Sequence, residues 1–343
     1  MAKISVIIPC FNAAKHLGRT MDSFITQTMG MDNLEIILVD DASTDGGATL
    51  DMCMEYEGRY PENIIVIPLE ENMRQGGARN IALIYASGDY VLYCDSDDWL
   101  VPKALERLYD IAVQYDCDVV EFDNIDTASY DVSDEIVRYG DMDDEYWEIN
   151  TVDERREYVV GNRTTPGCWN KLYRRPMLVE NNIRYAEHVI YEEPAFTYMV
   201  RFVEKKHYYV HEVLHYCYLH TGSTMRSDYE SRKFDNMKTI DELYCNLVDK
   251  GFMNEYSEEI EYIFWYWYFF SGCCFAAGKL TFFTADEFAG LKEHTAEIVK
   301  DIRINKYFKR KFENLTALGD LTYLEMNRLN MDSVYSVFRR FVS

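Results

Sequence analysis

Residues 90–99 read Tyr-Val-Leu-Tyr-Cys-Asp-Ser-Asp-Asp-Trp, an apolar strand that runs directly into three carboxylates. Carboxylates this close repel one another and are costly to desolvate, so packing alone does not explain Asp95, Asp97 and Asp98. Oxygen ligands suit hard cations, and Mg²⁺ is usually shared between one or two carboxylates and the phosphates of a substrate. The stretch therefore predicts a divalent-cation site at the end of a strand, although Asp98 alone could equally cap a helix that follows Trp99.

Strand and helix patterns alternate around this stretch. Apolar, strand-like runs are expected at 3–9, 34–39, 64–68, 89–94 and 119–122, and helices at 14–28, 47–56, 76–86 and 102–115. Near-continuous apolar strands separated by helices indicate a mostly parallel sheet that is covered on both faces. Ligands of such α/β sheets bind at the carboxyl ends of the strands. Further polar or unusual residues follow two of these strands: Pro9, Phe11, Asn12, Asp40 and Asp41.

Composition narrows the classes of protein. The chain has 343 residues and a formal net charge of −24, which argues against a general nucleic-acid binder because such proteins carry a basic footprint. Half of that charge lies in residues 118–157, with 15 Asp or Glu against 3 Arg, and the pattern of elements blurs from about 127 to 163. We expect a long, variable insert there. The nine cysteines are scattered without zinc-type spacing, which favours reduced thiols in a cytosolic protein.

The C-terminal part is expected to be helical after about residue 227. Its aromatic run at 265–270 predicts core packing first, with a homodimer interface or an acceptor-side wall as alternatives. Residues 300–311 hold six Lys or Arg against one Asp, which indicates a solvated helix face or a peripheral contact with an anionic membrane. The N-terminus is typical of a strand and not of a signal peptide. A cytoplasmic location is expected, with the inner face of the membrane as an alternative.

Six segments, in this order, resemble glycosyltransferase family 2. They are residues 4–12, 35–45, 75–82, 88–98, 169–173 and 192–196. The resemblance implies a GT-A fold over residues 1–225: a Rossmann-like, mostly parallel central sheet flanked by helices. Within it, residues 1–100 would bind a nucleotide-sugar, and residues 101–225 would provide the acceptor side and the catalytic base. Residues 226–343 would form an all-helical domain.

The resemblance also implies the reaction. It is an inverting transfer, of the hexosyltransferase type, from a nucleotide-diphosphate sugar to a hydroxyl of a glycan or lipid-linked glycan. UDP-sugar is the default donor, and cell-surface polysaccharide or glycoconjugate synthesis is the setting. The implied donor contacts are Pro9, Phe11 and Asn12 beside the base and ribose, Asp40 or Asp41 at the base edge, Arg79 at the diphosphate, Asp95 near the ribose, and the neighbouring Ser96.

The implied metal ligand is Asp97, which would hold Mn²⁺ or Mg²⁺, with His220 as a further metal or phosphate contact. Arg226 is a weaker candidate of the same kind. A divalent cation and one arginine can neutralise the charge that develops on a leaving diphosphate without covalent chemistry by the protein. The implied acceptor contacts are Trp169, Lys171 and Glu192.

Glu193 takes the position of the catalytic base. The family usually has Asp there, so the Glu is a departure that places the carboxylate one methylene further out. Because Pro194 suits the first turn of a helix, Glu193 is predicted to be an exposed N-cap, where the helix dipole favours the ionised form that a base needs.

Two other functions stay open on the sequence. A sugar nucleotidyltransferase would share the parallel sheet and the acidic metal site. It normally carries a glycine-rich, basic loop after the first strand, and residues 9–14 have neither property. A non-catalytic nucleotide-sugar-binding relative is favoured only by the Glu at position 193.

Overall fold

The structure is a computed structural model that describes residues 2–132, 135–138, 142–161, 163–220, 232, 234–272 and 283–312. It comprises two compact units. The first consists of Met1–Thr151 and Arg163–Ser223, and the second of Val152–Asn162 and Thr224–Ser343. The boundary after Ser223 lies close to the one expected at residue 225, but the second unit also takes in a segment from within the acidic insert.

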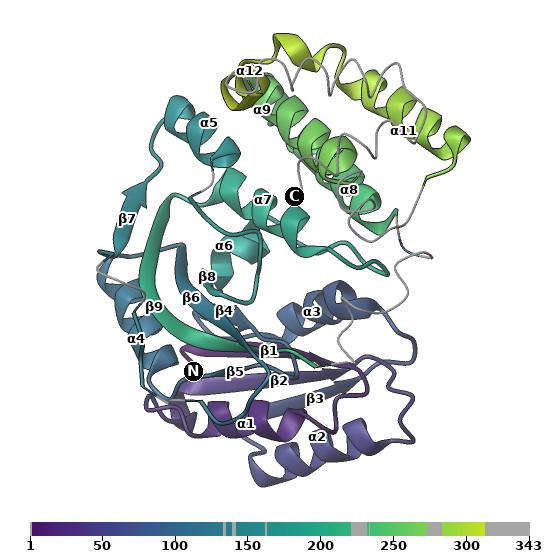
Figure 1. Cartoon of the computed structure of the whole chain (residues 1–343). Coiled ribbons are helices and arrows are strands. Elements are labelled where there is room, and N and C mark those ends of the chain that lie inside the picture. Colours follow the sequence, from purple (N-terminus) through teal and green to yellow (C-terminus); the bar gives the residue numbers. More distant parts are fainter. Residues whose placement is uncertain are drawn as a thin grey trace. The chain divides into compact units, whose positions relative to one another are not determined.

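The first unit is built on one mixed sheet (Figure 1). Its strands are β1 (Ile4–Cys10), β2 (Leu34–Asp40), β3 (Ile64–Pro68), β4 (Tyr90–Tyr93), β5 (Trp99–Leu100), β6 (Val119–Thr127), β7 (Glu145–Glu148), β8 (Lys171–Arg174) and β9 (Lys206–Tyr218). Within the described residues the strand order is β3-β2-β1-β4-β8-β6-β9-β5, and β7 pairs with β9.

The strands β3, β2, β1 and β4 pair in parallel, as the alternating pattern predicted. Beyond β4 the sheet becomes mixed, because β8 runs antiparallel to both β4 and β6 while β9 runs parallel to β6. Local sequence patterns identify strands but not the direction in which distant strands pair, so this part was not predictable. Two strand-like runs of sequence, 206–210 and 213–218, form the single strand β9.

Helices cover both faces of this sheet. They are α1 (Leu17–Ile25), α2 (Ala48–Arg59), α3 (Arg74–Tyr85), α4 (Ala104–Gln114), α6 (Arg175–Glu180) and α7 (Glu193–Val203), with a short 3₁₀ turn at Met31–Asn33. Because side chains alternate along a strand, Ile4, Val6 and Ile8 of β1 pack into one core with α1, α2 and α4. The helix α3 lies on the opposite face (Figure 1). The carboxyl ends of β1, β2 and β4 therefore meet beside α3.

The second unit is helical throughout its described residues. It contains α5 (Val152–Val160), α8 (Asp235–Asp249), α9 (Met253–Phe264), a π-helical turn (Trp265–Ser271), α11 (Ala285–Ile298), a 3₁₀ turn (Ile302–Ile304) and α12 (Lys306–Phe312). In the aromatic run, Trp265, Tyr268 and Phe269 are buried, which agrees with core packing. No helix in the described ranges has the length and apolarity needed to cross a membrane.

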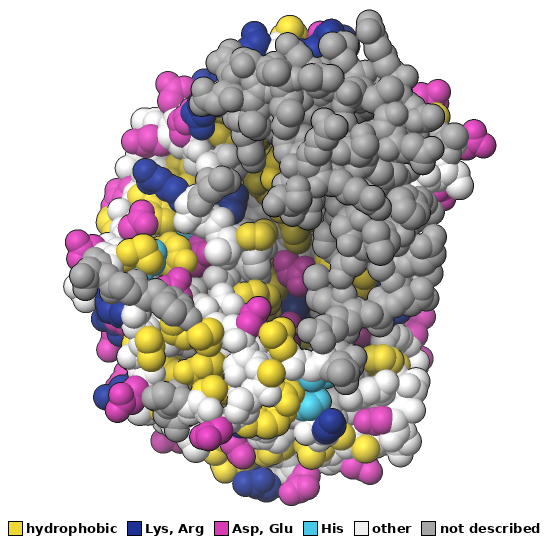
Figure 2. Space-filling view, viewed as in Figure 1, with side chains coloured by type: hydrophobic (Ala, Val, Ile, Leu, Met, Phe, Trp, Pro, Cys, Tyr) yellow, Lys and Arg dark blue, Asp and Glu magenta, His cyan; other side chains and the backbone are white. Residues whose placement is uncertain are grey.

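The basic segment at 300–311 has partners for several of its cations. Lys306 lies 3.2 Å from Glu258 and 3.3 Å from Glu259, and Arg310 lies 2.6 Å from Glu157. Figure 2 shows basic and acidic side chains interspersed over the described part of one face. These ion pairs reduce the charge that the segment could offer to an anionic surface.

Candidate active site

The loops after β1 and β2 are tied together by Asn12. Its backbone adopts φ of +52°, a left-handed conformation that Asn tolerates, and its Oδ1 accepts a 2.7 Å hydrogen bond from the backbone N–H of Thr44. Beside it, Phe11 is 43% exposed. Pro9 is tolerated inside β1 because the β1–β4 ladder ends at the pair Ile7 and Tyr93, so no N–H is needed there. The result is a fixed polar rim with an accessible aromatic ring.

Asp40 and Asp41 are both buried but have different surroundings. Oδ1 of Asp41 accepts a 2.6 Å hydrogen bond from the backbone N–H of Met73. Burial nevertheless raises the pKa of Asp41 to about 6, and the like charge of Asp40 adds to the shift. Oδ1 of Asp40 has no hydrogen-bond partner within the described residues. Of the two, Asp41 holds the chain just before α3, and Oδ1 of Asp40 is buried without a donor in the described part of the chain.

Arg79 lies on α3 with only 1% of its surface exposed. Its Nη1 donates to Glu192 at 2.6 Å, and its Nη2 donates to Asp95 at 2.8 Å. Glu192 is also buried, and burial together with the neighbouring Glu193 raises its pKa to about 8. The guanidinium thus joins the strand end that carries Asp95 to the start of α7, and Glu192, expected at the acceptor, is its ion-pair partner.

Asp97 and His220, the two predicted metal contacts, come together. Nε2 of His220 lies 2.7 Å from Oδ2 of Asp97. Burial and the carboxylates of Asp98 and Asp95 raise the pKa of Asp97 to about 6. Such a carboxylate would gain from a cation, so the donor set fits a divalent ion. The neighbouring Ser96 uses its carbonyl oxygen to accept a hydrogen bond from Thr20 at 2.9 Å.

The alternative that Asp98 caps the following helix does not hold. That helix, α4, begins only at Ala104, and Asp98 lies in the turn between β4 and β5. Its Oδ1 accepts a 2.8 Å hydrogen bond from the backbone N–H of Tyr218, at the end of β9. A strand far away in the sequence takes up this carboxylate, which local sequence could not indicate.

Glu193 is the first residue of α7 and is half-buried, so the prediction of an exposed N-cap is corrected. Glu192 occupies the N-cap position instead. Burial raises the pKa of Glu193, against the lowering effect of Arg79. One turn on, Phe196 stacks on Tyr185 at 3.9 Å and meets Tyr93 edge-on, which locks the start of α7 against the sheet. Glu193 is therefore held close to Arg79 and Asp95.

Gly76 has a packing role at the contact between α3 and the segment before α7. A Cβ at this position would lie 2.3 Å from the carbonyl oxygen of Ala186 and 3.2 Å from Cγ of Glu192. Only glycine lets the segment before α7 approach α3 this closely. The glycine is thus a condition for the contact between Arg79 and Glu192.

Trp169 and Lys171, the predicted acceptor contacts, belong to a loop that a second group of charges holds. Nζ of Lys171 is buried and donates to the carbonyl oxygens of Thr165 and Gly167 at 3.0 and 2.7 Å. It also lies 3.2 Å from Glu121. The half-buried Trp169 projects from the same loop. Lys171 therefore shapes the loop that presents the indole and is itself turned away from solvent.

This second group extends to two more buried residues on one side of Glu121. Nε2 of His207 lies 3.3 Å from Glu121, and its Nδ1 lies 2.8 Å from Glu204. Although burial acts in the opposite direction, Lys171 and His207 lower the pKa of Glu121 to about 2. We refer to Glu121, Lys171, Glu204 and His207 as the Lys171 cluster, and to Arg79, Asp95, Asp97, Glu192 and Glu193 as the Arg79 cluster.

Several residues that lie near Asp97 were not predicted from the sequence. Nδ1 of His16 lies 2.6 Å from the hydroxyl of Tyr130, and its ring centroid lies 4.5 Å from that of His220. His215 and Cys217 approach Asp98, and one ligand atom from each of the three lies within 4.8 Å of the others. A lone His or Cys carries no local signal, so only the fold reveals these neighbours. Arg226 lies outside the described residues.

The strands β3, β2, β1 and β4 are parallel, and an arginine-bound carboxylate and a predicted cation site lie at their carboxyl ends, which is where α/β proteins bind ligands. The model of the family "Glycosyl transferase family 2" matches residues 5–181, and the chain belongs to this family. The crystal structure of Staphylococcus aureus TarS 1-349 in complex with UDP-GlcNAc superposes with a TM-score of 0.66 at 20% identity, covering 99% of this chain and 91% of that chain. The fold is thus GT-A, as expected.

Two curated relatives are more similar in sequence. A poly(ribitol-phosphate) beta-glucosyltransferase of Bacillus spizizenii is 32% identical over 197 residues, which are 57% of this chain and 29% of that protein. The Escherichia coli protein described as uncharacterized glycosyltransferase YibD is 28% identical over 281 residues, which are 76% of each chain. The chain thus spans less than a third of the first relative and about three quarters of the second.

Proposed function

We propose that this protein transfers a sugar from a nucleotide-diphosphate donor to a hydroxyl of a cell-surface glycan or lipid-linked glycan, with inversion at the anomeric carbon. The observation that carries the proposal is the Arg79 cluster, in which one buried arginine links Asp95, next to the predicted cation ligand, to the start of the helix that carries Glu193. Names of relatives, such as the poly(ribitol-phosphate) glucosyltransferase, support a polymeric cell-surface acceptor.

In the proposed donor site, Phe11 lies against the base and the free oxygen of Asp40 accepts from the base edge. Asn12 orders the rim between these two residues. Because a structural neighbour contains UDP-GlcNAc, uridine is the base to test first. Asp95 and Ser96 border the ribose. Arg79 would neutralise the diphosphate. Because its two carboxylate partners already orient the guanidinium, donor binding costs little side-chain entropy at this residue.

A divalent cation would be held by Asp97 and His220. When bound, Mn²⁺ or Mg²⁺ supplies positive charge to the leaving diphosphate. Glu193 then accepts the proton of the acceptor hydroxyl, and that oxygen attacks the anomeric carbon from the face opposite the diphosphate. A raised pKa makes the carboxylate of Glu193 a stronger proton acceptor. Trp169 provides a flat apolar surface for an acceptor sugar, and Lys171 keeps its loop in place.

The remaining parts of the proposal concern location and assembly. We place the protein in the cytoplasm, where nucleotide-sugars are made. A peripheral membrane contact through 300–311 would bring it to a lipid-linked acceptor, and the partly exposed Tyr266, Trp267 and Phe270 would form a homodimer contact. Residues 1–225 would carry the transfer, and residues 226–343 the contacts with acceptor or membrane.

The direct test measures nucleoside diphosphate released from a panel of nucleotide-sugars with Mn²⁺, starting with UDP-sugars. Wild type should release the diphosphate, and Asp97→Asn should lose this activity. Asp126→Asn, which alters an exposed carboxylate of β6, is the matched control and should retain it. Binding without turnover, seen as a raised unfolding temperature with a donor but no release, would instead support a non-catalytic binding protein.

A further inference from the structure

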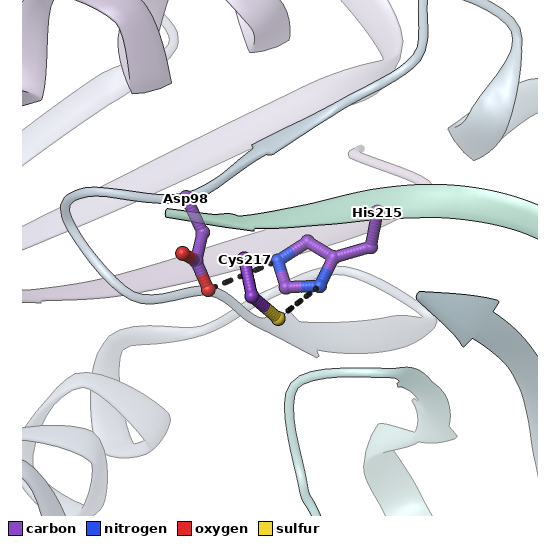
Figure 3. Close-up of side chains that lie close together, drawn as sticks. All are labelled: Asp98, His215 and Cys217. Atoms are coloured by element: carbon purple, nitrogen blue, oxygen red, sulfur yellow. Dashed lines mark hydrogen bonds and ion pairs between the residues drawn. The ribbon is translucent and has the colours of Figure 1, made fainter. Parts of the chain in front are cut away.

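The end of β9 contacts the Asp97–Asp98 turn at more than one point. His215 and Cys217 lie two residues apart on β9, so they project from the same face of the strand. Figure 3 shows both of them beside Asp98. Nε2 of His215 lies 3.3 Å from Oδ2 of Asp98, and Nδ1 lies 3.6 Å from Sγ of Cys217. Both ring nitrogens therefore have a close neighbour, although the approach of Nε2 to Asp98 is an ion-pair contact and not a hydrogen bond.

Asp98 is likewise engaged at both oxygens. Oδ1 accepts the backbone N–H of Tyr218 at 2.8 Å, and Oδ2 faces His215. His215 has no exposed surface, and the side chain of Asp98 is 8% exposed. Behind them, Nδ2 of Asn124 on β6 donates to Sγ of Cys217 at 3.5 Å. This buried chain runs from the sheet to the turn and leaves Asp98 little freedom to rotate.

The neighbouring Asp97 is contacted by a residue that follows the same strand. His220, two residues beyond the end of β9, contacts Asp97 at 2.7 Å. We propose that His215 is a positioning residue that fixes Asp98 and thereby holds the adjacent carboxylate of Asp97 in place for a divalent cation. This rests on the proposed function, since it takes Asp97 as the cation ligand. Partners behind a metal ligand typically account for a 10- to 100-fold change in metal affinity.

The same three side chains could instead be taken for a metal site of their own, since their ligand atoms lie within 4.8 Å of one another. The geometry favours a positioning role for His215. Asp98 contacts one nitrogen of the His215 ring and Cys217 the other, so the imidazole lies between the two side chains and links them. Burial and nearby carboxylates also raise the pKa of the Cys217 thiol well above its usual value, which disfavours the thiolate that metals bind.

The test measures Mn²⁺ affinity directly, by electron paramagnetic resonance of free Mn²⁺ in titrations of the purified protein without nucleotide. His215→Phe should weaken Mn²⁺ binding about tenfold or more. His215→Gln, whose amide can still donate to Asp98, should recover much of the affinity. Asp98→Asn tests the same contact from the other side and should weaken binding if His215→Phe does not fold.

The matched control is His207→Phe. His207 is equally buried and lies on the same strand, but roughly 25 Å away along β9. The His207→Phe variant should have a lower thermal midpoint of unfolding and an unchanged affinity for Mn²⁺. Folded His215→Phe or Asp98→Asn with wild-type affinity would overturn the proposal, and so would Zn²⁺ binding that Cys217→Ser abolishes. If wild type itself binds no Mn²⁺, the cation part of the proposed function fails instead.

Discussion

The first unit contains two groups of charged residues, one buried and one partly buried, that are built on different principles. In the Lys171 cluster, two carboxylates face a lysine and a histidine, and the pKa of Glu121 is lowered to about 2. In the Arg79 cluster, four carboxylates accompany one guanidinium, which contacts two of them, and the pKa of Glu192 is raised to about 8. One group has matched charges and the other has a surplus of negative charge.

This difference separates a structural network from a binding site. The Lys171 cluster pairs its charges internally, and its contacts join a loop to the neighbouring strands β8, β6 and β9. The Arg79 cluster leaves carboxylates in an environment that disfavours their charge, which is the condition that a cation relieves. Substitutions in the first should therefore change stability, and substitutions in the second should change activity.

The largest expected effect is on turnover. Glu193→Gln removes the proposed base, and it should lower kcat by about 10²- to 10⁴-fold while the unfolding temperature stays near that of wild type. The measurement is the rate of sugar transfer at saturating donor. Glu180→Gln, an exposed glutamate at the end of α6, is the control. Transfer by Glu193→Gln at the wild-type rate would show that another group is the base.

The corresponding prediction for the Lys171 cluster concerns stability. Glu121→Gln leaves the buried ammonium of Lys171 without its anionic partner, and we expect a loss of about 3–5 kcal/mol in the free energy of unfolding. Chemical denaturation measures it. If the folded variant binds donor as well as wild type, the division between the two clusters holds. A large loss of donor affinity without loss of stability would break it.

A third prediction concerns the contact that assembles the Arg79 cluster. Gly76→Ala forces a Cβ against the carbonyl oxygen of Ala186, and it should cost about 1–3 kcal/mol of stability and weaken donor binding. Gly58→Ala in α2 is the control, because nothing lies within 4 Å of the new Cβ. It should stabilise by about 0.5–1 kcal/mol. Equal effects of both would mean that the close approach is not needed.

The two clusters should also respond to pH in opposite directions. Because the folded-state pKa of Glu192 is raised to about 8, its contribution is full below about pH 4.5 and is lost as the pH rises toward 8. The folded-state pKa of Glu121 is lowered to about 2. Glu121 therefore contributes to the free energy of unfolding above about pH 4.5, and this contribution is lost as the pH falls toward 2. Each slope can reach about 1.4 kcal/mol per pH unit.

Calorimetry of wild type, Glu192→Gln and Glu121→Gln between pH 3 and pH 9 checks this. Glu192→Gln should flatten the decline on the alkaline side, and Glu121→Gln the decline on the acid side. Identical pH profiles for all three proteins would show that neither carboxylate titrates differently in the folded state.

The smallest effect is expected at the surface of the second unit. Lys306 pairs with Glu258 and Glu259 but is half exposed, so Lys306→Ala should change stability by no more than about 1 kcal/mol. Thermal unfolding measures it. A larger loss of stability would mean that this exposed ion pair behaves like those of the buried cluster. In a separate measurement, binding of Lys306→Ala to anionic vesicles at the wild-type level would argue against a membrane contact through 300–311.

Much of the first unit could be predicted from local pattern. The apolar runs that became β1, β2, β3 and β4 were evident because buried parallel strands need near-continuous hydrophobic residues. Asp95 and Asp97 stood out because adjacent carboxylates at a strand end are costly without a partner. The antiparallel strand β8 and the union of two runs in β9 were not predictable, since pairing depends on residues far away in the chain.

The sequence by itself determined the family, the strands and the residues at their ends, because each of these is encoded within a few neighbouring positions. Only the tertiary structure decided how those residues are partnered. It joined Arg79 to Glu192, 113 positions away, and Asp97 to His220, 123 positions away. It also turned Lys171 inward and set His215 behind Asp98. Charge pairing is a matter of distance in space and of burial, and neither is written in local sequence.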